Sequence, residues 1–220
     1  MYNEILQMFV SEDNLRPKFL KPFFINDLAI ATNAHALIFF DKTLCEEKLT
    51  PYIDKPESIL SVIPNERNEN FSIPIETIKA AIAKCPLIDE IKEEKITCDA
   101  CDGEGTVEYE FDYGYKSYEL EGDCPVCNGE GSTGKDIPTG NRVVDMFTPI
   151  KIKNSCFSAF YLNKLVQVAK ILNKDSIVLT LMTGKNNTTI FKIDNVEIIL
   201  MPLMFEGVKK DMIELCHLKN

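Results

Sequence analysis

The chain has 220 residues, of which 45% are hydrophobic, and its 24 Lys and Arg against 34 Asp and Glu give a formal net charge of −10. This length allows one medium domain with a small extra module, and the acidic balance works against unselective binding to phosphate backbones. The sequence has no membrane-length apolar stretch, no secretory leader pattern, only two histidines and no GxSxG, HExxH or phosphate-loop motif, so we expect a cytoplasmic protein that is not an enzyme and has no membrane partner.

The first part of the chain predicts a helix, a strand meander and a second helix. Apolar residues at helical spacing in 1–10 predict an amphipathic helix. Short apolar runs in 22–41, divided by turn-forming asparagines, predict consecutive strands. The prolines, acids and asparagines of 46–70 predict a loop, and 71–86 predicts a short strand that continues into a helix ended by Pro86.

The last part of the chain predicts a β-α-β-β-β unit. We expect one strand over 147–157, a helix over 158–172 and three strands over 176–182, 188–193 and 196–204. The predicted helix has a core stripe at helical spacing, formed by Leu162, Leu165, Ala169 and Leu172. A further short helix is predicted within 206–220.

Two copies of a CxxCxGxG pattern, CDACDGEG at 98–105 and CPVCNGEG at 124–131, lie between these parts. Two CxxC turns supply four thiolates, which is the tetrahedral ligand set of a structural Zn²⁺ site with no open coordination position. The predicted ligands are Cys98, Cys101, Cys124 and Cys127. The glycines after each pair allow backbone N–H groups to turn toward the sulfurs. Four free cysteines and a redox-active dithiol are the alternatives.

The segment between the two cysteine pairs predicts a β-hairpin with a dense set of aromatic side chains. These are Tyr109, Phe111, Tyr113, Tyr115 and Tyr118, and they alternate with Asp and Glu. Aromatic residues are enriched at protein interfaces, and the acidic neighbours suit a basic protein better than a phosphate backbone. One hypothesis is therefore a zinc-hairpin module for protein–protein interaction, on a scaffold that does not bind DNA.

Two family resemblances are present in the sequence. The CxxCxGxG repeats resemble those of the cysteine-rich domain of DnaJ-type chaperones, but this chain has two repeats where that family has four, and it lacks the HPD tripeptide. LAIATNAHALIFF at 28–40 resembles the strand motif around ATDGHRLA in the bacterial sliding clamp, the β subunit of DNA polymerase III, and 160–204 resembles the last half-domain of that clamp with its MPM-like ending.

The clamp resemblance implies an α+β processivity fold, the DNA clamp fold, with a zinc-bound β-hairpin insertion. It implies clamp-like parts over 1–95 and 141–207, an insertion over 96–140 and a tail over 208–220. The function implied is that of a non-enzymatic accessory protein of DNA replication or repair. Its partners would be DNA, replication or repair proteins and, in a ring, further copies of itself.

The same resemblance assigns two sites. A groove for short peptides of polymerases and loaders falls on Thr32, His35, Leu37, Leu200, Met201, Pro202 and Leu203. Its two halves come from neighbouring domains in clamps, so it would form here in a head-to-tail assembly or not at all, and simple core packing is the alternative. The DNA-facing residues would be Lys164, Lys170 and Lys174, for which an ordinary solvated helix surface is the alternative.

Overall fold

The computed structural model of the protein describes residues 1–64, 70–181, 189–203 and 213–215. The chain forms two compact units. Unit 1 consists of Met1–Pro86 and Val144–Asn220, and unit 2 is the segment Leu87–Val143 that lies between them in the sequence. None of the helices in the described part of the chain has the length and apolar content that a bilayer span needs.

The described residues of unit 1 include an eight-stranded sheet with the order β4-β1-β2-β3-β14-β13-β12-β5. Its strands are β1 (Phe23–Ile25), β2 (Leu28–Thr32), β3 (Ala36–Asp41), β4 (Thr50–Pro51), β5 (Asn70–Pro74), β12 (Ser176–Leu181), β13 (Thr189–Ile193) and β14 (Val196–Leu200). All neighbours are antiparallel except β1 and β4. The pairing of β3 with β14 joins the predicted meander and the predicted C-terminal strands in one sheet.

Both faces of this sheet are covered in its middle. Successive side chains of a strand point to opposite faces. Ile38 and Phe40 of β3 belong to the main core, whereas Leu37 and Phe39 of the same strand belong to a second, smaller core. A strand buried on both sides is apolar at nearly every position, which explains why this segment does not alternate cleanly between apolar and polar residues.

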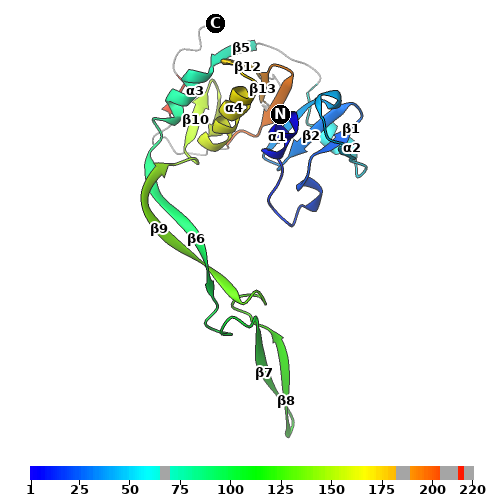
Figure 1. Cartoon of the computed structure of the whole chain (residues 1–220), viewed down its shortest axis with the longest axis vertical. Helices are drawn as coiled ribbons and strands as arrows, with labels where there is room; N and C mark the ends of the chain where they lie inside the picture. The colour runs from blue at the N-terminus through cyan, green and yellow to red at the C-terminus, as the bar shows by residue number, and fades with distance from the viewer. Residues whose placement is uncertain (65–69, 182–188, 204–212, 216–220) are drawn as a thin grey trace. The chain divides into compact units, whose positions relative to one another are not determined.

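Three helices contribute to the main core (Figure 1): α1 (Tyr2–Gln7), α3 (Ile75–Ile82) and α4 (Ala159–Ile171). Ser158 caps α4 because its hydroxyl oxygen accepts a hydrogen bond from the backbone N–H of Tyr161. The predicted core stripe of α4 is confirmed, since all four of its residues are buried. Each buried leucine contributes about 1.5–3 kcal/mol, so packing of one face stabilises this helix.

Two predictions within unit 1 are wrong in detail. The segment predicted as a loop over 46–70 contains β4 and helix α2 (Pro56–Leu60) in its described part, with Pro56 in the first helical turn and Ile59 buried in the second core. The segment predicted as one strand over 147–157 is a hairpin of β10 (Pro149–Ile152) and β11 (Ser155–Ser158). The chain turns at Lys153, whose φ is +55°.

The predicted C-terminal helix lies mostly outside the described residues. Its described residues Ile213–Glu214 form strand β15 rather than a helix. They pair in parallel with Ile150 and Lys151 of β10, and together with β11 they make a three-stranded sheet. Backbone pairing with β10 has therefore overridden the local helical pattern at these two positions.

Unit 2 consists of two two-stranded ribbons, whose strands run in opposite directions (Figure 1), and of the cysteine turns between them. Strands β6 (Leu87–Thr97) and β9 (Ser132–Val144) pair in one ribbon, and β7 (Thr106–Tyr113) and β8 (Lys116–Asp123) form the predicted hairpin. The residue pair Gly114 and Tyr115 connects β7 to β8, and Gly114 has a φ of +66°. A glycine with positive φ at the first position of such a loop is typical of a type II′ turn.

Candidate functional site

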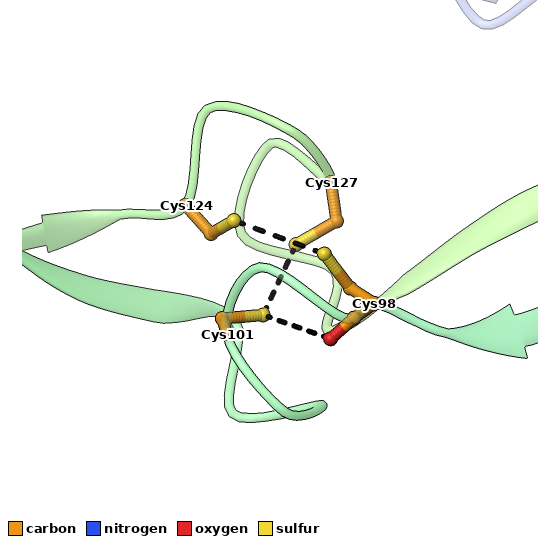
Figure 2. A group of neighbouring side chains, drawn as sticks. All are labelled: Cys98, Cys101, Cys124 and Cys127. Atoms are coloured by element: carbon orange, nitrogen blue, oxygen red, sulfur yellow. Dashed lines mark hydrogen bonds between the residues drawn. The ribbon is translucent and has the colours of Figure 1, made fainter.

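Four cysteine side chains meet between the two ribbons of unit 2 (Figure 2). All four are buried, and the sulfurs of Cys98, Cys101, Cys124 and Cys127 lie within 4.8 Å of one another. The Sγ atoms of Cys98 and Cys124 are 3.9 Å apart, and those of Cys101 and Cys127 are 3.7 Å apart. Sulfurs placed tetrahedrally at about 2.3 Å from a zinc ion would be about 3.8 Å apart. The cluster could therefore hold a metal ion.

Backbone N–H groups point at two of the sulfurs, as the glycine pattern predicts. Gly105 donates to Sγ of Cys101 over 3.3 Å, and Gly131 donates to Sγ of Cys127 over 3.2 Å. Each bond runs from the last glycine of a CxxCxGxG segment to the second cysteine of the same segment. Such donors offset the negative charge of a thiolate and fix the orientation of a metal ligand.

The two cysteine segments are also tied to each other through the backbone. The N–H of Cys98 donates to the carbonyl of Gly131 over 3.0 Å, and that of Cys124 donates to the carbonyl of Gly105 over 2.8 Å. The approach is too close for a larger residue, because a Cβ at Gly131 would lie 2.3 Å from the carbonyl oxygen of Gly103. Glycine is thus required where the two turns touch.

The environment acts differently on two of the thiols. Burial raises the pKa of Cys98 from 9.0 to about 11. Backbone N–H groups, first that of Cys127 and then that of Val126, lower the pKa of Cys124 to about 7. Since the thiolate is the form that binds metal, a bound cation would displace the protons that these buried thiols carry.

A second candidate site is a groove of about 530 Å³ in unit 1, where β2, β3 and β14 meet α2. The register of β3 and β14 sets Leu37 opposite Ile199 and Ala36 opposite Leu200. Residues more than half the chain apart in sequence are therefore neighbours on two adjacent strands of one sheet. The volume lies within the range of about 300–1,000 Å³ that is usual for ligand pockets.

Most of the predicted groove residues line this one cavity. They are Thr32, His35, Leu37, Leu200, Met201 and Pro202; Leu203 is not among the lining residues. The clamp resemblance implies that the two halves meet in a head-to-tail assembly or not at all, whereas the structure brings residues of both halves to one cavity within a single chain. Their role in binding a peptide stays a prediction.

The turn between β2 and β3 is held in place by its own polar groups. The hydroxyl of Thr32 donates to the carbonyl of Ala36 over 2.8 Å, and Ala34 has a φ of +71°. The side-chain oxygen of Asn33 accepts hydrogen bonds from the backbone N–H groups of His35 and Ala36. This rim of the groove is a pre-formed turn, so a ligand would pay little to order it.

Sequence reasoning missed one wall of the groove. Phe19, from a short 3₁₀ helix (Pro17–Phe19), and Ile59 and Val62, from α2 and the residues after it, line the cavity opposite the strands. Pro56 followed by apolar residues three and six positions later was the available signal. It was obscured by the acids and prolines around it.

The three lysines predicted to face DNA have different environments. The Nζ of Lys164 donates to the carbonyl of Met8 over 2.6 Å and lies 4.6 Å from the ring centre of Phe160. Burial lowers the pKa of Lys164. Its charge is therefore engaged within unit 1.

The other two lysines are exposed at the end of α4. Lys170 and Lys174 line a second cavity of about 550 Å³ together with Lys79 of α3 and the acidic Glu76 and Asp175. Lys79 pairs with Glu76 at 2.7 Å, and Lys174 pairs with Asp194 at 3.4 Å. The structure thus brings two of the three predicted lysines together and adds one from a neighbouring helix. DNA binding by these residues stays a prediction.

The aromatic residues predicted to bind a partner lie along the hairpin of unit 2. Tyr109, Phe111, Tyr113 and Tyr118 share one face of β7 and β8, and Tyr115 lies in the turn. All five side chains are exposed.

No protein-family model and no curated protein sequence matches the chain. The structure is similar to that of the DNA polymerase III β subunit of Borrelia burgdorferi in complex with a natural product, at 12% identity and a TM-score of 0.50, covering 93% of this chain and 61% of that one. The sliding clamp of Bartonella birtlesii bound to griselimycin matches at 14% identity and a TM-score of 0.48, covering 92% and 63%. The β clamp of Helicobacter pylori bound to a DNA ligase peptide matches at 9% identity and a TM-score of 0.47, covering 93% of this chain and 62% of that one.

The chain spans about three fifths of the length of these clamps. At such low identity the similarity concerns the fold alone. The chain is a mixed α/β protein that resembles the DNA clamp fold, and this level of the fold prediction is confirmed.

Proposed function

We propose that this chain is a non-enzymatic, clamp-like accessory protein of DNA replication or repair, and that its groove binds a short apolar peptide of a partner protein. The observation that carries the proposal is the cavity formed jointly by β2, β3 and β14, the segments that resemble clamp motifs. The clamp-like fold supports it. In this proposal 1–95 and 141–207 form the clamp-like part, 96–140 is a zinc-binding insertion, 208–220 is a tail, and the protein acts in the cytoplasm.

The lining of the groove favours apolar anchor side chains. His35 is the one titratable residue among those that line it, and Met201, with 59% of its surface exposed, offers a flexible thioether at the rim. An anchor that loses about 100 Å² of apolar surface there gains about 2.5 kcal/mol. Two such anchors in an extended peptide would give a weak but measurable affinity.

Peptide binding can be measured by fluorescence anisotropy with labelled clamp-binding peptides of replicative polymerases and clamp loaders. Met201→Asp and Val62→Asp place a charge on the rim of the groove without disturbing a buried residue. We expect each to weaken binding at least about tenfold. Leu15→Asp, at a side chain that is 91% exposed and outside the groove, is the control. Equal affinity of all variants for every peptide would contradict the groove assignment.

Zinc is the proposed metal, in a structural role. Four thiolate donors with the observed sulfur separations support a closed tetrahedral site, and such a site leaves no position for a substrate. Elemental analysis of the purified chain should give one zinc per chain and none for Cys98→Ser with Cys127→Ser. Iron in place of zinc would overturn the choice of metal.

Duplex DNA is the second proposed ligand, at the end of α4 where Lys79, Lys170 and Lys174 gather. Phosphate contacts of this kind make affinity fall steeply with salt. Replacing all three lysines by Glu should abolish binding to duplex DNA, whereas Lys48→Glu should not. A native mass measurement would show whether copies assemble. A monomer without DNA affinity would contradict DNA binding by these lysines. Peptide binding by the groove is tested separately by the anisotropy measurement.

A further inference from the structure

The acidic excess of the chain belongs entirely to unit 2. Residues 87–143 contain fifteen Asp and Glu but five Lys and Arg, a formal charge of −10, which is the value for the whole chain. Unit 1 is therefore formally neutral. Unit 2 repels polyanions and attracts cationic surfaces.

The hairpin of unit 2 has two chemically different faces. The register sets Tyr109 opposite Leu120 and Phe111 opposite Tyr118, so these side chains share one face. On the other face Glu108 lies opposite Glu121, and Glu110 lies opposite Glu119. Like charges directly opposite each other destabilise a strand pair, so the acidic face costs the isolated hairpin stability.

The aromatic face is held by a hydrogen bond near the cysteines and is exposed to solvent toward the turn. At its base, the hydroxyl of Tyr109 donates to the carbonyl of Asp123 over 2.8 Å, and the absent side chain of Gly122 leaves room for the tyrosine ring. Farther out, Phe111 is 61% and Tyr113 is 74% exposed, with their rings stacked at 6.5 Å. Within the described residues β7 and β8 pair only with each other.

We propose that the β7–β8 hairpin is the docking element for a basic protein, one that presents an apolar strip flanked by Lys and Arg. Its apolar strip would cover the aromatic face, where each ring can bury about 150–250 Å². Its cations would offset the repulsion between the opposed Glu side chains, so a cationic partner would stabilise the acidic face.

The same charges argue against two other occupants. A nucleic acid could stack its bases on the rings, but its phosphates would meet the acidic unit. A second copy would bring a second unit with the same charge of −10. This inference is independent of the groove and of its peptide ligand.

The proposal is tested by selecting a displayed library of random short peptides on the full chain whose groove is blocked by Met201→Asp and Val62→Asp. We expect the selected peptides to alternate Lys or Arg with apolar residues. The variant Glu108→Gln, Glu110→Gln, Glu119→Gln, Glu121→Gln should bind them at least about tenfold more weakly at low salt. This variant removes like-charge repulsion, so the hairpin should stay folded. Asp89→Asn, Glu93→Gln, Glu94→Gln, Asp136→Asn removes the same charge from the β6–β9 ribbon and should change binding less than about threefold.

A second variant tests the other face. Phe111→Ser with Tyr113→Ser should also abolish peptide binding while the metal content is unchanged. Selected peptides without basic residues, or equal weakening by the two charge variants, would overturn the proposal. Tight binding of single-stranded oligothymidine that the aromatic variant abolishes would assign the face to nucleic acid instead. A dimer that the aromatic variant dissociates would assign it to a second copy.

Discussion

Replacing Gly131 by alanine tests whether the last glycine of each cysteine segment sets the metal geometry. Gly131 has a φ of +70°, and a Cβ at this position would lie 2.3 Å from the carbonyl oxygen of Gly103. The left-handed backbone costs an alanine about 1–2 kcal/mol. The clash must in addition push the two turns apart, and this movement would displace the N–H that contacts Sγ of Cys127.

Gly140→Ala is a matched control for this variant. Gly140 has a similar φ of +82°, but no heavy atom of the described residues, apart from those of Gly140 and its two chain neighbours, lies within 4 Å of the position of its Cβ. Both variants have the backbone cost, and only Gly131→Ala displaces an N–H donor from a sulfur. Competition with a chromophoric zinc chelator should show an affinity about 10- to 100-fold lower for Gly131→Ala, the usual loss when a group that orients a ligand is disturbed. Equal affinities of the two variants would refute this reasoning.

Three further predictions concern the two units separately. Removing the metal with a chelator should expose the amides of 106–123 to rapid hydrogen exchange and leave those of α4 unchanged, because metal binding of roughly 10 kcal/mol stabilises a ribbon that is marginal alone; equal exchange with and without metal would contradict it. Leu162→Ala should lower the free energy of unfolding by about 2–5 kcal/mol in urea titrations, since this side chain is fully buried, whereas the exposed Gln167→Ala should change it by less than about 0.5 kcal/mol. Burial lowers the pKa of Lys164 in the folded chain below its ordinary value of 10.5. At a pH between the lowered pKa of the folded chain and the ordinary pKa of the unfolded chain, the unfolded chain therefore binds more protons than the folded one. The free energy of unfolding should therefore rise with pH through that window, and the rise should be smaller in Lys164→Met.

The elements that could be predicted from the sequence are those whose pattern is long and local. Helix α4 combines a serine cap with a stripe of four buried residues, and both signals lie within the segment itself. The β7–β8 hairpin is similar, because its strands are adjacent in sequence and its connection contains a glycine. Local signals of this kind need no knowledge of the rest of the chain.

The elements that could not be predicted depend on contacts distant in sequence. Helix α2 is too short to show a periodic pattern, and it is stabilised by Ile59 in the second core. Strand β15 exists because Ile213 pairs with Ile150 of β10. The pairing of β15 leaves no mark in the local sequence, and the spacing of Pro56, Ile59 and Val62 is too short a signal to predict α2 by itself.

The groove shows the same limit at the level of a site. The resemblance to clamp motifs selected residues on both of its strands, but only the pairing of β3 with β14 shows that one chain is sufficient to bring them together. The wall contributed by Phe19 and Val62 had no counterpart in those motifs. Sequence patterns therefore indicated which residues to consider, and the sheet topology determined which of them meet.

Ionic strength should separate the two proposed binding surfaces. The groove is lined mainly by apolar side chains, and His35 is the one titratable residue of its lining, so burial of apolar surface dominates there and added salt should change its affinity little. The hairpin binds through charge in a unit that carries the whole net charge of the chain, and exposed charges are largely screened beyond about 8 Å at physiological salt. Raising the salt should therefore release a basic partner from the hairpin while a peptide stays in the groove. Release of both ligands over the same range of salt concentration would contradict this difference in salt dependence between the groove and the hairpin.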